Sequence, residues 1–232
     1  MVDFFEYNDI ASFEFGLIVT GLRTYGAPNR RVETVHVRGR NGDLLIDEGT
    51  FDNIIVSYDI AVVQDFEVNA RAIAQWLLAD GGYHDLWDTY NDDLMRRATY
   101  FNAIDFDVES LRKQGKATIN FYAKPQRFLT SGNNVTTFTS SGTITNPTSF
   151  ASKPLLRVYG TGTLIVNGYV ITVNSVNSYV DIDCESMQCY KGTTNCNNNV
   201  TINKFPVLKS GSNTINLQGV SKVDITPRWW TI

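Results

Sequence analysis

Three carboxylates occupy alternate positions of one short segment, a spacing at which acid–base chemistry is conceivable. They are Asp105, Asp107 and Glu109. Carboxylates two residues apart on a strand lie about 7 Å apart on one face, which is near the separation that glycosidases use. However, Ile104, Phe106 and Val108 alternate with them as an apolar set. The pattern is typical of a half-buried antiparallel strand with a solvated face, and we prefer that interpretation to catalysis.

A second acidic group gathers in the segment DLWDTYNDD, where a calcium ion could bind. Its carboxylates are Asp85, Asp88, Asp92 and Asp93. An EF-hand loop requires the pattern D-x-[DN]-x-[DN]-G, which this segment lacks. We therefore expect an ordinary turn-rich loop, with incidental calcium binding as the alternative.

Five arginines lie close together in the sequence, near Tyr25. They are Arg23, Arg30, Arg31, Arg38 and Arg40. Clustered arginine beside an aromatic ring can bind phosphate. In the whole chain, however, 24 acidic residues outnumber 20 basic ones, so no global charge attracts nucleic acid. We favour an ion-paired subunit interface or a solvated hairpin.

The three cysteines, Cys184, Cys189 and Cys196, suggest a metal site or a disulfide. A zinc site would need a fourth ligand and closer spacing, and both histidines, His36 and His84, are distant in sequence. The odd number and a reducing compartment favour free structural thiols. Metal binding or a disulfide remains the alternative.

The sequence also lacks the motifs of common enzyme classes. It contains no G-x-S-x-G, P-loop, dinucleotide fingerprint or H-E-x-x-H. We predict no enzymatic activity, no cofactor and no metal. The amino terminus has no basic flank or long apolar core, and the longest apolar stretch, residues 70–79, is too short for a bilayer. We expect a soluble protein made in a cytosol, without a membrane anchor.

The elements that position these residues are mostly strands, with one helix. Residues 32–63 predict strands, and Asn41-Gly42 between two strand-like runs predicts a β-hairpin. An apolar stripe at helical spacing predicts a helix that lies across a sheet. The stripe consists of Ala70, Ile73, Ala74, Leu77 and Leu78. We expect Asp65 or Asn69 to cap this helix and Gly81-Gly82 to end it. The strand at 116–124 is expected to stop at Pro125.

The composition changes near residue 130, where we place a domain boundary between residues 1–130 and 131–232. The segment 130–149 is almost entirely Ser, Thr, Asn and Gly, and it is either a linker or an edge strand. Short strand-like runs with turn residues between them follow to the carboxyl end. This spacing predicts a β-sandwich or jelly roll.

The last residues, Pro227-Arg228-Trp229-Trp230, carry large apolar side chains at a chain end, where segments usually fray. Successive side chains of an extended segment point to opposite faces. We therefore expect one tryptophan to fill a core and the other to cover a seam between domains or between subunits.

Several stretches resemble the distal tail proteins of siphophages that infect Gram-positive bacteria. In chain order they are GRNGDLLIDEGTFDNIIVSYDI, ARAIAQWLLADGGYHDLWDTYND, TNPTSFASKPLLRVYGTGTLIVNG, FPVLKSGSNTINLQG and DITPRWWTI. The terminal motif is the most specific piece. The residues that carry the resemblance as structural motifs are Asn41, Gly42, Gly81, Gly82, Pro227, Arg228, Trp229 and Trp230.

The resemblance implies a mainly β fold: an amino-terminal β-sandwich with one α-helix, similar to tail-tube proteins, and a carboxy-terminal galectin-like β-sandwich. It implies a homohexameric ring, single or in stacked rings, at the tail tip of a phage or prophage virion, assembled in the bacterial cytoplasm. DNA would pass through the ring without sequence-specific binding. The implied partners are the tail tube protein, the tail-associated lysin or tail fibre, and receptor-binding proteins.

Two other functions compete with a structural ring. One is a carbohydrate-binding module that contacts the host surface, although residues 131–220 contain no tryptophan and no histidine for a lectin site. The other is a glycanase that uses Asp105, Asp107 or Glu109. A lone lectin would not need the helix-containing amino-terminal half, so we favour the ring.

Overall fold

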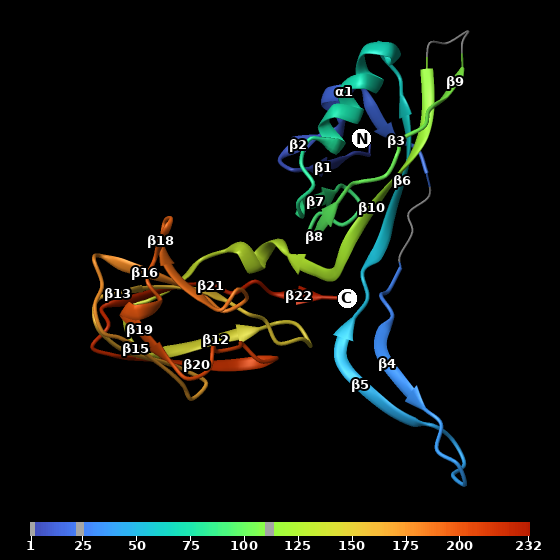
Figure 1. The fold of residues 1–232 in the computed structure, drawn as a ribbon. Coiled ribbons are helices and arrows are strands. Elements are labelled where there is room, and N and C mark those ends of the chain that lie inside the picture. Colours follow the sequence, from blue (N-terminus) through green and yellow to red (C-terminus); the bar gives the residue numbers. More distant parts are fainter. Residues whose placement is uncertain (1–2, 22–25, 110–113) are drawn as a thin grey trace. The chain divides into compact units, whose positions relative to one another are not determined.

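The computed structural model describes residues 3–21, 26–109 and 114–232. In these ranges the chain is built mainly from β-strands and has a single α-helix, which confirms the predicted mainly β class (Figure 1). The fold divides into two compact units, Met1–Arg127 and Phe128–Thr231. No described helix has both the length and the apolar character needed to cross a membrane.

The first unit is a curved antiparallel sheet with a helix packed on it. Its elements are β1 (Phe5–Tyr7), β2 (Ile10–Ala11), the 3-10 helix η1 (Ser12–Phe15), β3 (Leu17–Val19), β4 (Arg30–Val35), β5 (Leu44–Phe51), β6 (Ile54–Val62), α1 (Phe66–Leu78), β7 (His84–Asp88), β8 (Leu94–Thr99), β9 (Asp107–Glu109) and β10 (Gln114–Leu129). The main sheet follows the order β2-β1-β7-β8-β10-β6-β3, and β9 pairs with β10.

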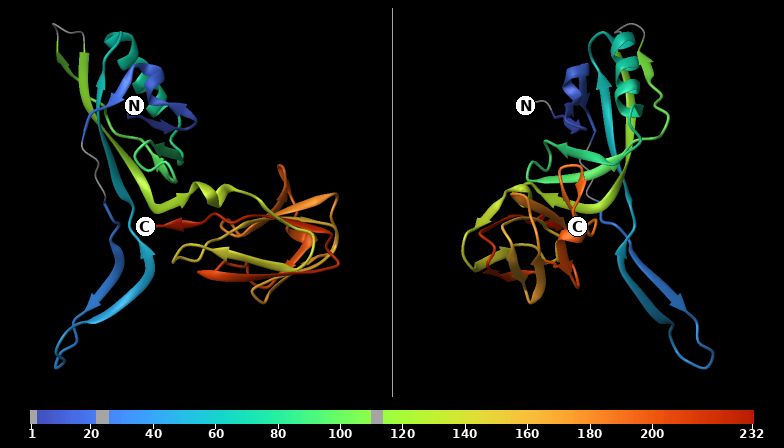
Figure 2. Two further views of the ribbon diagram at one scale, coloured as in Figure 1. Left: turned by 180° about the vertical axis from the view of Figure 1, so that it is seen from behind. Right: turned by 60° about the vertical axis from the view of Figure 1, so that its left-hand side comes forward.

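Helix α1 lies alongside β6 and closes the core of the first unit (Figure 2). Ile73 and Leu77 of the predicted stripe are fully buried there. Aromatic rings fill the space between helix and sheet, with Phe5 stacked on Tyr58 at 4.7 Å between ring centroids. Trp76 donates its indole N–H to the carbonyl of Tyr7 at 3.2 Å. The helix therefore packs through aromatic side chains as well as through the predicted aliphatic stripe.

The ends of the helix differ from the prediction. Asp65 occupies the N-cap position, but its side chain makes no capping hydrogen bond. Asn69 lies inside the helix and donates its amide to the carbonyl of Gln64. The helix ends at Leu78, which is 51% exposed, and the next residue keeps a right-handed helical conformation. Two residues thus separate Gly81-Gly82 from the helix end, and these glycines supply no left-handed cap.

Strand β10 continues through Pro125, where we expected it to stop. Its pairing with β6 ends at Ala123, opposite Ile54. Because Pro125 lies beyond this ladder, its missing N–H removes no hydrogen bond to β6.

The second unit is a β-sandwich of two antiparallel sheets (Figure 1). Its elements are η2 (Thr130–Asn133), β11 (Thr136–Phe138), β12 (Gly142–Asn146), β13 (Leu155–Tyr159), β14 (Gly162–Val166), β15 (Tyr169–Val173), β16 (Tyr179–Asp183), β17 (Gln188–Lys191), β18 (Thr194–Asn195), η3 (Asn197–Asn199), β19 (Val200–Ile202), β20 (Gly211–Gln218), β21 (Lys222–Thr226) and β22 (Trp230–Thr231). One sheet has the order β11-β21-β13-β16-β17-β18 and the other β12-β20-β14-β15-β19.

Alternate residues of these strands point into one core between the two sheets. On β13, for example, Leu156 and Val158 are fully buried, while their neighbours Arg157 and Tyr159 point outward. The Ser- and Thr-rich segment after residue 130 forms β11 and β12, each of which is the edge strand of its sheet. Of the two interpretations of this segment, the edge strand is therefore the correct one.

Candidate functional site

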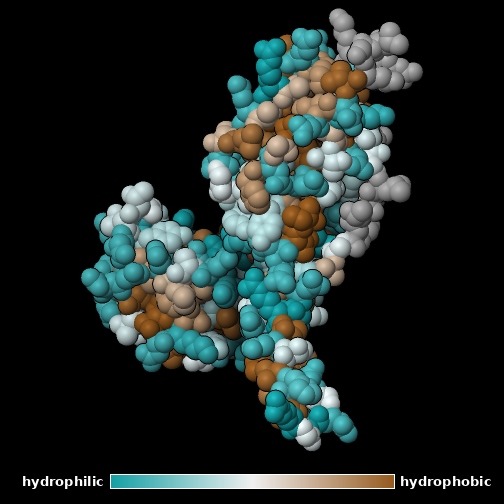
Figure 3. Space-filling view, turned by 45° about the vertical axis from the view of Figure 1, so that its right-hand side comes forward, coloured by the Kyte–Doolittle hydropathy of each residue, from teal (hydrophilic) through white to brown (hydrophobic). Residues whose placement is uncertain are grey.

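The hairpin of β4 and β5 is an exposed apolar surface. Among the described residues its two strands form a sheet of their own. Leu45 is 64% exposed and Ile46 is 46% exposed. Because they are adjacent on one strand, they place apolar side chains on opposite faces of the hairpin. Figure 3 shows hydrophobic side chains gathered along this part of the chain. A two-stranded hairpin is marginally stable alone in water, so these faces are candidates for contact with another protein surface.

The hairpin loop is longer than the sequence motif suggests. The strand register ends with Val35 opposite Leu44, so residues 36–43 form the loop. Asn41 and Gly42 lie in this loop, and Gly42 has a φ of 77°. The prediction of a hairpin is correct, but Asn41-Gly42 does not form a two-residue turn.

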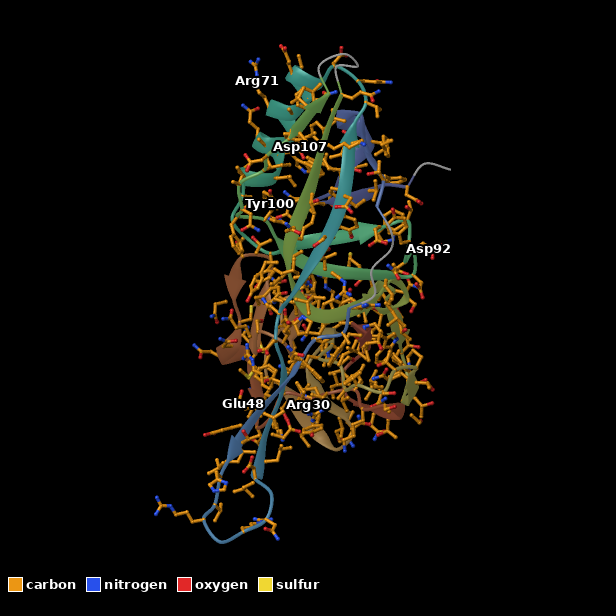
Figure 4. The ribbon with its side chains drawn as sticks, turned by 90° about the vertical axis from the view of Figure 1, so that its right-hand side faces the viewer. Arg30, Glu48, Arg71, Asp92, Tyr100 and Asp107 are labelled. Atoms are coloured by element: carbon orange, nitrogen blue, oxygen red, sulfur yellow. The ribbon has the colours of Figure 1, made fainter. Side chains whose placement is uncertain are left out.

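The predicted arginine cluster is ion-paired within the hairpin region. Arg30 contacts Asp47 at 2.6 Å, and Arg31 contacts Asp52 at 2.7 Å. The hydrogen bond from Arg30 holds the pKa of Asp47 below its ordinary value. Figure 4 shows Arg30 and Glu48 on this part of the chain. These two arginines are thus engaged by carboxylates of their own chain, which suits both an ion-paired subunit interface and a solvated hairpin.

The remaining residues of the predicted arginine cluster lie in the hairpin loop or outside the described residues. Arg38 and Arg40 are exposed in the hairpin loop. Arg23 and Tyr25 lie outside the described residues.

The terminal motif is fixed to the second unit by hydrogen bonds on every residue. The carbonyl of Pro227 accepts from the hydroxyl of Ser152 at 2.7 Å. The backbone N–H of Arg228 donates to the carbonyl of Gly132 at 2.8 Å. The carbonyl of Trp229 accepts from the N–H of Leu129 at 2.9 Å. These bonds fix the backbone of the motif to the second unit.

Arg228 has a φ of 56°, a left-handed conformation that is uncommon for a residue with a side chain. Its guanidinium binds both carboxylate oxygens of Asp183, at 2.7 and 3.2 Å. Burial alone would raise the pKa of Asp183, but hydrogen bonds from Arg228 and from the N–H of Glu185 outweigh it and lower that pKa. The bidentate ion pair therefore offsets the cost of the backbone conformation.

The two tryptophans have different surroundings. Trp229 is 5% exposed and belongs to the core of the sandwich. Trp230 is half-buried, stacks on Phe150 at 4.4 Å between ring centroids and donates its indole N–H to the carbonyl of Ala151 at 2.9 Å. One ring thus fills a core, as strand alternation predicts, and the other covers Phe150 of the same unit. Its role at a seam remains a prediction.

The strand with Asp105, Asp107 and Glu109 is shorter than expected, because β9 begins only at Asp107. Asp105 and Asp107 are exposed, in agreement with a solvated face (Figure 4 labels Asp107). Val108 is 53% exposed, so the apolar face does not continue to it. The side chain of Glu109 lies outside the described residues.

The acidic residues of the DLWDTYNDD segment have different roles, and the carboxylate of Asp88 forms the turn. Asp88 accepts hydrogen bonds from the N–H groups of Tyr90 and Asn91, at 2.9 and 3.0 Å. Asp85 faces Arg97 at 3.8 Å. Asp92, labelled in Figure 4, accepts the indole N–H of Trp87 on its backbone carbonyl. In the described part of the chain, no group of three or more His, Cys, Asp or Glu side chains is placed to hold a metal ion.

The three cysteines are free thiols in the second unit. Cys184 and Cys189 are buried, and Cys196 is half-exposed. Burial raises the pKa of Cys184 to about 12 and that of Cys189 to about 11. This arrangement agrees with structural thiols.

The outer face of the β13 and β16 strands carries paired tyrosines that resemble an aromatic platform. Tyr159 and Tyr179 are cross-strand neighbours with ring centroids 6.0 Å apart. However, the guanidinium of Arg157 lies 4.3 Å from the ring of Tyr179, and the Lys222 ammonium lies 4.1 Å from that of Tyr159. A sugar would have to displace these cations from the ring faces in order to stack there. The tyrosines of this face therefore belong to a charged network within the chain, and this arrangement argues against a lectin site.

Sequence reasoning missed a buried amide network beneath β12 and β20. Asn146 and Asn213 are 2% and 0% exposed. Asn146 donates to the carbonyls of Phe150 and Leu208, and Asn213 donates to those of Lys209 and Gly211. The Asn146-Pro147 dipeptide is a turn signal, but nothing in the sequence distinguishes Asn213 from the many other asparagines.

Comparisons with known proteins give matches only at the level of structure. No family model and no curated protein matches the sequence. The solved structure of the SPP1 Dit protein, described as a paradigm of the hub adsorption apparatus in phages infecting Gram-positive bacteria, matches with a TM-score of 0.74 and 13% identity over 100% of both chains.

Two structures of the activated phage p2 baseplate, with Ca and with Sr, match with TM-scores of 0.55 and 0.51. Each is 9% identical over 97% of both chains. The chain therefore has the fold of the SPP1 Dit protein over its full length.

Proposed function

We propose that this chain is a structural protein of a phage tail tip and that it forms the hub at the distal end of the tail tube. The observation that carries the proposal is the match to the SPP1 Dit fold over the full length of the chain, so that both units are covered. At 13% identity this likeness concerns the fold alone, so the assignment also rests on the surfaces described above.

The hub is a homohexameric ring of the first units, with DNA passing through its opening. The apolar faces of the β4–β5 hairpin support this arrangement, since exposed Leu45 and Ile46 need a cover. A neighbouring copy supplies that cover through a heterologous interface that closes on itself. The ion pair of Arg30 with Asp47 also joins the two strands of the hairpin.

The ring joins the tail tube to the tail-associated lysin and the receptor-binding proteins in the virion. The second unit is a galectin-like sandwich that supports these partners and does not bind sugar itself. Its outer tyrosines are covered by cations, which supports a structural role over a lectin role.

The experiment is a comparison of Leu45→Asp with Val170→Asp by negative-stain microscopy and native mass spectrometry. Both residues are exposed and apolar, at 64% and 46%, and Val170 lies on β15 in the second unit. We expect Leu45→Asp to abolish six-fold rings while both variants melt like the parent protein. Equal ring formation by the two variants would contradict the role of the hairpin.

A further inference from the structure

Strand β8 carries Arg96, a half-buried arginine whose Nη1 atom has no hydrogen-bond partner within the described residues. The Nη1 atom of Arg96 is excluded from solvent and unpaired. Burial lowers the pKa of Arg96 to about 10, and repulsion by Arg127 is the second cause. The guanidinium therefore remains charged at neutral pH. A buried guanidinium nitrogen without a hydrogen-bond partner is costly, so it requires an explanation.

The neighbouring Arg127 does not relieve this charge. It lies on β10 and donates its Nη2 to the carbonyl of Gly26 at 3.0 Å. Arg96 and Arg127 line the same cavity, which has a volume of about 380 Å³. Two cations of like sign in one cavity raise each other's energy unless an anion lies between them.

The carboxylates that line the cavity are engaged elsewhere. Asp88 accepts the hydroxyl of Tyr58 at 2.7 Å, in addition to the turn N–H groups and the Asn91 side chain. Asp59 accepts the hydroxyl of Thr118 at 2.7 Å. The charge of Asp88 favours protonated Arg96 through space, but it forms no hydrogen bond to Arg96.

The other groups that line the cavity can hydrogen-bond to a polar ligand. Asn29, Asn53, Ser57 and Asn91 contribute amide and hydroxyl groups to its lining. A cavity of this size accommodates a group much larger than one water molecule. Guanidinium groups bind oxyanions by paired, charge-assisted hydrogen bonds, which are strong where water is excluded.

We propose that this cavity binds an oxyanion, with Arg96 and Arg127 as its cationic ligands. Carboxylate and phosphate share the required chemistry. The group comes either from solution, as inorganic phosphate, or from an acidic side chain of a second copy of this chain. Only the second source depends on the ring proposed above.

The first test measures inorganic phosphate binding by isothermal titration calorimetry at constant ionic strength. Arg96→Met keeps an apolar side chain of similar length and removes the charge, and Arg127→Met is its counterpart. Arg71→Met, on the exposed side of α1 (Figure 4), is the matched control. We expect both cavity variants to bind phosphate at least about tenfold more weakly than the parent, and the control to bind like the parent.

The same variants separate ligand binding from a structural role. In buffer without oxyanions, Arg96→Met should be at least as stable as the parent, because it removes a buried nitrogen that has no hydrogen-bond partner. If Arg96 had a purely structural role, its removal would instead destabilise the fold. A clear loss of stability in that buffer therefore overturns the proposal.

Native mass spectrometry distinguishes the two sources. If a second copy supplies the carboxylate, phosphate competes with assembly of the parent, and Arg96→Met remains folded but fails to assemble. If the anion comes from solution, Arg96→Met assembles normally and only phosphate binding is lost. The proposal is overturned if the parent neither binds phosphate nor loses assembly on substitution of Arg96.

Discussion

Substitution of Trp229 by Ala tests how the terminal motif holds the second unit together. The indole is 5% exposed in the sandwich core, and the backbone around it is fixed through Gly132 and Leu129. A Cβ on Gly132 would lie 2.5 Å from the backbone nitrogen of Trp229, so the chain end approaches η2 closely. The surroundings therefore have little freedom to collapse around the lost ring.

The magnitude follows from the area that the ring buries. A tryptophan of about 150–250 Å², at about 25 cal/mol per Å², gives roughly 4–6 kcal/mol as an upper bound. Measured large-to-small changes of this kind cost about 3–5 kcal/mol. For a domain of about 100 residues, 1 kcal/mol shifts the melting temperature by about 4–8 °C, so a loss of at least about 12 °C is expected.

The assay is differential scanning calorimetry of the full chain. Trp230→Ala is the control, because this ring is half-buried and its loss removes one stack and one hydrogen bond. We expect the control to cost about 1–2 kcal/mol. A Trp229→Ala protein that melts within about 3 °C of the parent would refute the reasoning.

Three further predictions concern the second unit. The lowered pKa of Asp183 means that its ion pair stabilises the fold above the unfolded pKa of about 3.9, and that this stability is lost as the pH falls through the lower folded value. Urea titrations should therefore show less acid sensitivity below about pH 4 in Asp183→Asn, and unchanged sensitivity would contradict the pairing. Gly132→Ala should cost about 1–3 kcal/mol by overpacking in the same urea assay, and a neutral result would argue against the close approach to the terminal backbone. In timed alkylation of folded protein, Cys196 should react before Cys184 and Cys189, whose pKa values burial raises to about 12 and about 11. All three should react after unfolding without reductant, and a persistent disulfide would be the opposite result.

Strand periodicity made the second unit largely predictable from the sequence. Leu156 and Val158 alternate with outward residues, and this alternation is local information that needs no tertiary contact. The helix was predictable for the same reason, since Ile73 and Leu77 repeat at helical spacing.

Features that depend on distant residues were not predictable. The continuation of β10 through Pro125 follows from where its pairing with β6 ends, and the local sequence does not contain that register. Likewise, the Arg228–Asp183 pair joins residues 45 positions apart. The buried, unpaired Nη1 of Arg96 could not be inferred, because a Met-Arg-Arg-Ala run is typical of an ordinary solvated strand.

The hairpin illustrates a partial success. Asn41-Gly42 correctly indicated a reversal of the chain, yet the loop extends over residues 36–43 because pairing stops at Val35 and Leu44. In the proposed ring, a neighbouring copy would cover Leu45 and Ile46, and the local sequence of one chain does not specify that contact.

The most direct test of the central claim is electron microscopy of the purified protein over a range of concentrations, alone and with isolated tail tubes. We predict six-fold rings that become more abundant with concentration, because assembly follows mass action, and that cap one end of each tube. A protein that remains monomeric at every concentration and leaves the tube ends bare would contradict the assignment to the tail-tip hub.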